Sequence, residues 1–178
     1  MKKTFAVLAI IALVVIVIII TFLKGGPSAT PEPKISVKIG EQVIKPIYYG
    51  DRYNQTRDEI ERFLDLPFED GSWEALPYVE LGDEVVIRFE NFEVGRVTIT
   101  EDLLNQEGKF LYDDRSTQTY DVEVEDREIH FELKSNWAVH LSSNSESYKP
   151  GHVIRAFVIR AEVGKSNFAF AFVIRTNP

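Results

Sequence analysis

The chain begins with an apolar run long enough to cross a lipid bilayer as one helix. Between Phe5 and Leu23 only Thr21 is not apolar. At about 1.5 Å per helical residue this run spans roughly the thickness of a hydrocarbon core. Cleavable signal peptides have a shorter apolar region of about 7–15 residues and a small-residue cleavage site, for which Pro27-Ser28-Ala29 is a poor fit. We therefore predict a retained transmembrane anchor over residues 1–24, with a removed signal peptide as the alternative.

The charges that flank this run predict its orientation. Lys2 and Lys3 precede it, whereas only Lys24 follows it. Because basic residues stay on the cytoplasmic side, the amino terminus is expected in the cytoplasm and the remainder outside it, in a single-pass protein of the cell membrane. Residues 25–34 contain three prolines and two glycines, which is a linker composition. Residues 35–178 then have the length of one domain.

Charge and cysteine content exclude several classes of function. After Lys24 the chain carries 28 acidic and 17 basic side chains, so its net charge there is −11. Such a body repels nucleic acid, which is therefore not an expected partner. The chain has no cysteine, which excludes disulfides, thiol catalysis and thiolate metal sites.

From residue 35 onward the sequence has the two-residue period of β-strands. Residues 35–39 alternate, and Gly40-Glu41 leads into residues 43–44 as a hairpin, with Pro46 marking an edge strand. One helix interrupts the pattern, with Thr56 and Glu59 at capping-box spacing. Further strands are expected over 84–90, 94–100, 117–125, 128–133, 152–163 and 166–176, with a weaker candidate at 110–112.

Two of these strand pairs allow a register to be predicted. A loop at Gly164-Lys165 aligns apolar side chains on one face, as Phe157 with Phe172, Ile159 with Phe170 and Ala161 with Phe168. A loop at Asp126-Arg127 does the same, as Val124 with Ile129, Val122 with Phe131 and Tyr120 with Leu133. Arg155 falls on the aromatic face of the first pair, so it must reach the sheet rim or find a partner.

The carboxyl-terminal half resembles known extracytoplasmic domains. The stretch Val79–Phe89 (VELGDEVVIRF) is similar to the first strand of many secreted immunoglobulin-like domains. Lys149-Pro150-Gly151 before a strand, then Gly164-Lys165 and the Phe-Ala-Phe-Ala-Phe run, resemble the way such domains end. The resemblance covers residues 78–178 and is to domains on anchored envelope proteins of Gram-positive bacteria. It implies an all-β, Ig-like antiparallel β-sandwich with one short helical insertion, and it assigns no site.

An acidic surface is the first candidate for interaction. With the register across Asp126-Arg127, six titratable side chains share one face, namely Asp121, Glu123, Glu125, Glu128, His130 and Glu132. Glu125 and Glu128, and Asp121 and Glu132, are then like-charged pairs. The face is interpreted as a solvated surface that resists aggregation, and alternatively as a site for a cation or a basic partner.

Aromatic side chains outside the strands are the second candidate. Recognition surfaces favour Tyr and Trp, which makes Tyr48, Tyr49, Tyr53 and Trp73 possible contacts. Trp73 is equally a candidate for covering the core. Trp137 lies in a strand-like run and is predicted to be buried in the core.

No motif for catalysis is found. Phosphate-loop, dinucleotide and zinc-protease patterns are absent from the sequence, and no catalytic, metal-binding or cofactor-binding residue is assigned. The expected role is a non-catalytic binding or accessory module of the cell envelope, held by its anchor and contacting an envelope protein or a basic partner. The alternatives are a carboxylate-dependent hydrolase and a ligand-sensing accessory domain.

Overall fold

The computed structural model describes residues 32–50, 56–64, 66–68, 72–164 and 166–178. The predicted anchor, most of the linker and Tyr53 lie outside the described residues. Within the described part of the chain no helix is long and apolar enough to cross a membrane.

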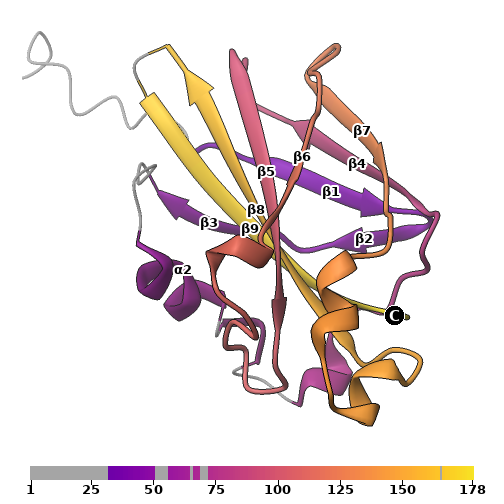
Figure 1. Ribbon diagram of the computed structural model, residues 1–178. Helices are drawn as coiled ribbons and strands as arrows, with labels where there is room; N and C mark the ends of the chain where they lie inside the picture. The colour runs from indigo at the N-terminus through magenta and orange to yellow at the C-terminus, as the bar shows by residue number, and fades with distance from the viewer. Residues whose placement is uncertain (1–31, 51–55, 65, 69–71, 165) are drawn as a thin grey trace, which may run out of the picture. The chain divides into compact units, whose positions relative to one another are not determined.

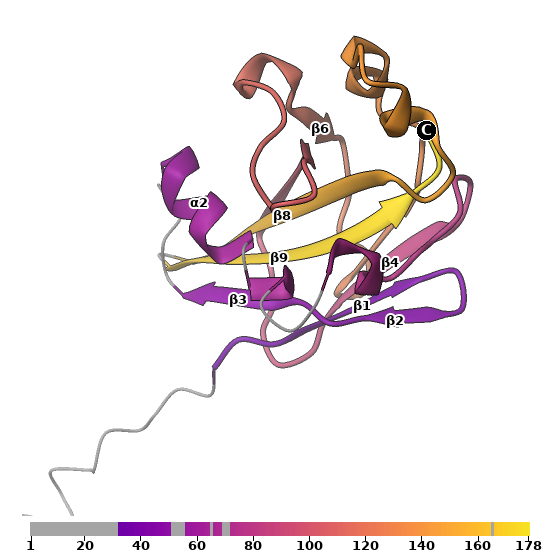
Figure 2. The ribbon, with the colours of Figure 1, turned by 90° about the horizontal axis from the view of Figure 1, so that it is seen from below.

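Residues 33–178 fold into two antiparallel sheets that pack face to face, as Figures 1 and 2 show. The strand orders are β2-β1-β4-β7 and β3-β9-β8-β5-β6. The strands are β1 Ile35–Ile39, β2 Gln42–Ile44, β3 Ile47–Gly50, β4 Glu84–Phe89, β5 Arg96–Leu104, β6 Gln118–Tyr120, β7 Glu128–Glu132, β8 Val153–Val163 and β9 Ser166–Thr176. Among the described residues one α-helix, α2 (Arg57–Leu64), accompanies five 3₁₀ helices: η1 Leu66–Phe68, η2 Trp73–Ala75, η3 Asp114–Ser116, η4 Trp137–Leu141 and η5 Ser145–Tyr148. The predicted all-β sandwich is confirmed.

The long hairpin of β8 and β9 forms the centre of the five-stranded sheet and has the predicted register. Phe157 lies opposite Phe172, and their rings stack with centroids 4.7 Å apart. Phe170 and Phe172 project into the core between the sheets, while Ala169 and Ala171 face the other way. The alternation of large and small side chains in β9 therefore distinguishes the two faces of the sheet.

The second face of this sheet is buried as well. Helix α2 lies across it, on the side away from β1 and β2 (Figure 2), and inserts Ile60 and Leu64 against Ala169 and Ala171. Small side chains in β9 allow the helix to approach closely. Burial on both faces explains why the sequences of β8 and β9 are nearly continuous apolar runs. The predicted capping box is confirmed, because the Thr56 amide donates to Glu59 Oε2 at 2.9 Å.

The hairpin predicted across Asp126-Arg127 forms only at its turn, and the strand pairing predicted on either side of the turn is wrong. Both turn residues have positive φ, and only Glu125 and Glu128 pair beside them. Strand β6 pairs with β5, and β7 pairs with β4, so the chain crosses between the sheets along residues 121–127. The alternating apolar side chains of this crossing segment pack against the open side of the core instead of against a partner strand. Apolar alternation specified the buried face but not the pairing partner.

Strand β5 continues past its predicted end at Thr100, through the charged pair Glu101-Asp102 to Leu104. Both acids are buried. Lys34, one of the first described residues, lies near the start of β5. Its amide donates to Oδ1 of Asn91, in the turn before β5, at 2.8 Å. Nine strand residues carry β5 about 26 Å from there to Leu104. We call the Leu104 end of the sandwich the distal end.

Candidate functional site

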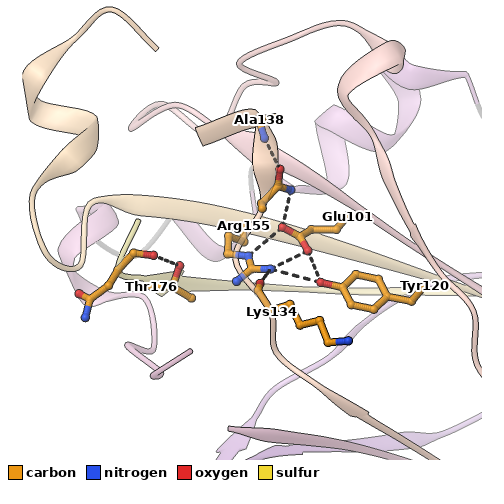
Figure 3. Close-up of polar contacts among 8 residues, drawn as sticks. Glu101, Tyr120, Lys134, Ala138, Arg155 and Thr176 are labelled. Carbon is orange, nitrogen blue, oxygen red and sulfur yellow. Dashed lines mark hydrogen bonds and ion pairs between the residues drawn. The ribbon is translucent and has the colours of Figure 1, made fainter. Parts of the chain in front are cut away.

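A buried ion pair lies on the inner face of the five-stranded sheet, toward the distal end (Figure 3). Arg155 of β8 and Glu101 of β5 are both fully buried. Arg155 Nε donates to Glu101 Oε1 at 2.8 Å, and Nη2 donates to Oε2 at 2.7 Å. This two-point geometry is the strongest form of an arginine–carboxylate contact. Of the two expectations for Arg155, emergence at the sheet rim or a buried partner, the structure shows the second, and the partner is Glu101.

The pair is the centre of a larger hydrogen-bond network. The Tyr120 hydroxyl donates to Glu101 Oε2, and Asn136 Nδ2 donates to Oε1 at 2.6 Å. Arg155 Nη2 also donates to the Lys134 carbonyl at 2.8 Å. Burial and the neighbouring carboxylate raise the pKa of Tyr120, so its hydroxyl stays a donor. The network joins β5, β6, β8 and the segment that precedes η4.

This network determines how η4 is presented. Asn136 Oδ1 accepts a hydrogen bond from the Ala138 amide and caps η4. Ala138 and Val139 take the buried positions, which leaves Trp137 exposed by 52% and Leu141 by 54%. The prediction that Trp137 belongs to the core is therefore wrong. The segment is a capped 3₁₀ helix, so its side chains do not alternate as they would in a strand.

Several exposed apolar side chains lie on the segments of the distal end. Each is more than 40% exposed: Leu111, Trp137, Leu141 and Tyr148. Trp137 and Leu141 line a hollow of about 420 Å³ together with Tyr112 and the Asp113–Arg115 pair. Tyr148 donates to the Ser142 carbonyl, beside Leu141. We call the four exposed residues the distal patch.

A pocket of about 370 Å³ opens beside the patch, between the end of β5 and the start of β8. Five buried aliphatic side chains lie at its base: Leu103, Leu104, Val139, Val153 and Ile154. Tyr112 lines both the pocket and the hollow beside Trp137. We call this space the distal pocket.

Two buried polar atoms of the distal pocket lack a well-formed hydrogen bond among the described residues. They are His152 Nδ1 and the Tyr112 hydroxyl. Burial raises the pKa of Tyr112, and the nearby Ser142 side chain offsets part of that rise. Unpaired buried polar atoms are uncommon and mark places where water or a ligand group is accommodated.

Two carboxylates of the distal end, those of Glu146 and Asp113, form ion pairs with neighbouring basic side chains. Glu146 binds Lys149 at 2.7 Å, which holds its pKa below the usual range, the opposite of what a general acid needs. Asp113 binds Arg115 and caps η3. Among the described residues no group of three or more His, Asp or Glu side chains is placed to hold a metal ion.

The predicted acidic face is only partly assembled. Glu128, His130 and Glu132 alternate along β7, with Glu125 beside Glu128. His130 lies 3.1 Å from Glu84 and 3.2 Å from Glu128, and these contacts raise its pKa.

Of the two like-charged pairs expected on this face, Glu125 with Glu128 is present and Asp121 with Glu132 is not. Glu132 is opposite Glu84 rather than Asp121, because Asp121 and Glu123 lie in the crossing segment. Arg88 also approaches Glu128, at 3.5 Å. Arg88, and His130 when it is protonated, thus offset part of the negative charge.

Of the predicted aromatic contacts, Tyr48, Tyr49 and Trp73 are among the described residues, and none of these three belongs to the distal patch. Tyr49 is buried against Phe63, with ring centroids 4.5 Å apart. Tyr48 is half-buried, with its ring centroid 5.1 Å from that of Phe170. Trp73 is half-buried against His152, behind the distal pocket. The exposed aromatic residues of the distal patch are Trp137 and Tyr148, and period-two reasoning placed Trp137 inside.

Comparisons of the chain with protein-family models, curated proteins and solved structures gave no match.

The buried network predicts strong coupling between its two charges. Replacing Arg155 by Met leaves a buried, unpaired carboxylate, and replacing Glu101 by Leu leaves a buried, unpaired guanidinium. Each change should lower the free energy of unfolding of residues 34–178 by about 3–5 kcal/mol, measured in urea. The double variant should lose less than the sum of the two, because no unpaired charge remains.

The exposed pair of Lys149 and Glu146 is the matched control, and Lys149→Met should change stability little. Additive losses for Arg155→Met and Glu101→Leu would contradict the coupling.

Proposed function

We propose that this chain is a membrane-anchored, extracytoplasmic binding module that holds a protein partner of the cell envelope at its distal patch. The observation that carries the proposal is the exposure of Trp137 and Leu141 on a segment fixed from below by the Arg155–Glu101 network. Burying an ion pair has a high desolvation free energy. Its presence beneath this segment therefore favours a surface with a role beyond solubility.

The chemistry of the patch supports this role. Apolar side chains that cluster on a surface mark interaction sites, and tryptophan is enriched among the residues that dominate binding energy. The 420 Å³ hollow beside Trp137 and Leu141 is flanked by the charged pair of Asp113 and Arg115. An apolar centre beside polar groups is the usual anatomy of a protein interface.

An Ig-like topology is part of the proposal. If β4, β5, β7, β8 and β9 are taken as strands B, C, E, F and G, then B pairs with E, C with F, and F with G. Strand β1 pairs with β4 as strand A does with B, and β6 pairs with β5 as strand C′ does with C. Strands β2 and β3 with α2 are then insertions between A and B.

The two alternative functions have less support. A hydrolase needs a carboxyl group with a raised pKa in the cleft, whereas the pKa of Glu146 is lowered. A sensing domain needs an enclosed apolar cavity, whereas the core between the sheets is filled by stacked aromatic and aliphatic side chains. The distal pocket lies at the end of the sandwich, next to the patch.

The location of the domain is tested by cysteine labelling, which the cysteine-free chain makes unambiguous. Ser143→Cys should react with a membrane-impermeant maleimide on intact, wall-stripped cells, and Lys3→Cys should react only after lysis. These results follow from a retained anchor with a cytoplasmic amino terminus. Protection of Ser143→Cys would contradict the extracytoplasmic location. A mature chain that lacks residues 1–24 would contradict the retained anchor.

Partner binding is tested by photo-crosslinking in the native cell. A benzophenone amino acid at Trp137 or Leu141 should form one shared, defined adduct. The same group at Val43, which is 80% exposed on β2, is the matched control and should not form it. An adduct at Val43 alone, or identical diffuse products at all three positions, would contradict docking at the distal patch.

A further inference from the structure

The distal pocket has an apolar base and an acidic opening. The aliphatic residues at its base are buried, whereas Glu107 and Glu146 among its lining residues are exposed. Its lining contains no Lys or Arg within the described residues. Lys149 already binds Glu146, but the Glu107 carboxylate makes no ion pair among the described residues. Glu107 is therefore a carboxylate of the lining without an ion-pair partner among the described residues.

This combination matches one kind of side chain. A lysine has an apolar stem of four methylene groups and a charged ammonium at its end, and it buries the stem while the ammonium seeks polar partners. A pocket of about 370 Å³ is large enough for such a group.

We propose that the distal pocket binds a lysine side chain of a basic peptide segment, with the stem against the aliphatic base and the ammonium toward Glu107. This assignment rests on the proposed function, because the distal patch beside the pocket holds the rest of that segment. The net charge of −11 after Lys24 also attracts a basic partner over long range.

The test uses the full chain in lipid nanodiscs and three small probes. They are Nα-acetyl-lysine methylamide, its Nε-acetylated form and Nα-acetyl-norleucine methylamide. Titrations are followed by the NMR shifts of the Leu103, Leu104 and Val153 methyl groups. The lysine probe should bind about three- to tenfold more tightly than either neutral probe, the range expected for a charge-assisted contact near the surface.

Two variants test whether Glu107 is the carboxylate that causes tighter binding of the lysine probe. Glu107→Gln should weaken binding of the lysine probe by the same three- to tenfold and leave the affinity for the norleucine probe unchanged. Glu132→Gln, which removes an exposed acid on β7, is the matched control and should change neither. Equal affinities for the lysine and norleucine probes, or shifts away from the distal pocket, would overturn the assignment.

The outcome separates this assignment from the proposed function. Val43→Ala should leave binding of the lysine probe intact, because Val43 is an exposed residue of β2 that does not line the pocket. Loss of probe selectivity with a retained crosslink at Trp137 would overturn the lysine assignment alone. Selective probe binding without any patch crosslink would overturn the protein-docking role and retain the pocket.

Discussion

The buried contact between Arg155 and Glu101 determines what the distal end of this sandwich can be. Removing two charges from water is expensive unless the geometry is good and the remaining donors and acceptors are used. Here Glu101 accepts from Arg155, Tyr120 and Asn136, and Arg155 also reaches the Lys134 carbonyl. Among the described residues Arg155 Nη1 has no hydrogen-bond partner, so this part of the cost of burial is not offset. The contact links three strands of one sheet to the segment that carries η4.

The rest of the fold makes that contact possible. Strand β8 is central in its sheet, with β5 and β9 on either side, and the opposite face is covered by α2 and its neighbours. Water is thus excluded from both faces, which strengthens electrostatic interactions inside the sheet. At the distal end Leu103 packs with Ala138, Val139 and Val153 in a small separate core. Trp137 and Leu141 remain outside that core and form the surface we assign to binding.

Much of the architecture could be predicted from local pattern. The register of β8 and β9 followed from period-two alternation across a two-residue loop, because each strand needed only its neighbour. The same alternation failed for residues 117–133, since Tyr120 pairs within one sheet and Phe131 within the other while both contribute to one core. Apolar alternation identifies the buried face of a strand, and long-range packing selects its partner.

The site was harder to predict than the fold for the same reason. Arg155 was recognisable as a buried charge that needed a partner, but Glu101 is 54 residues away and lay beyond the predicted end of its strand. Trp137 was assigned to the core because the segment was interpreted as a strand. The signal that was missed is Asn136, a capping residue that begins a 3₁₀ helix and reverses which side chains are exposed.

The most direct test of this account is amide hydrogen exchange in the Glu101→Gln variant. If the buried network holds η4, exchange should accelerate in residues 134–141, while β4 and β7 in the other sheet keep their protection. The exposed acid variant Glu132→Gln should leave exchange in residues 134–141 unchanged. Unaltered protection of residues 134–141 in Glu101→Gln, or a uniform loss across both sheets, would contradict the claim that this ion pair fixes the distal end.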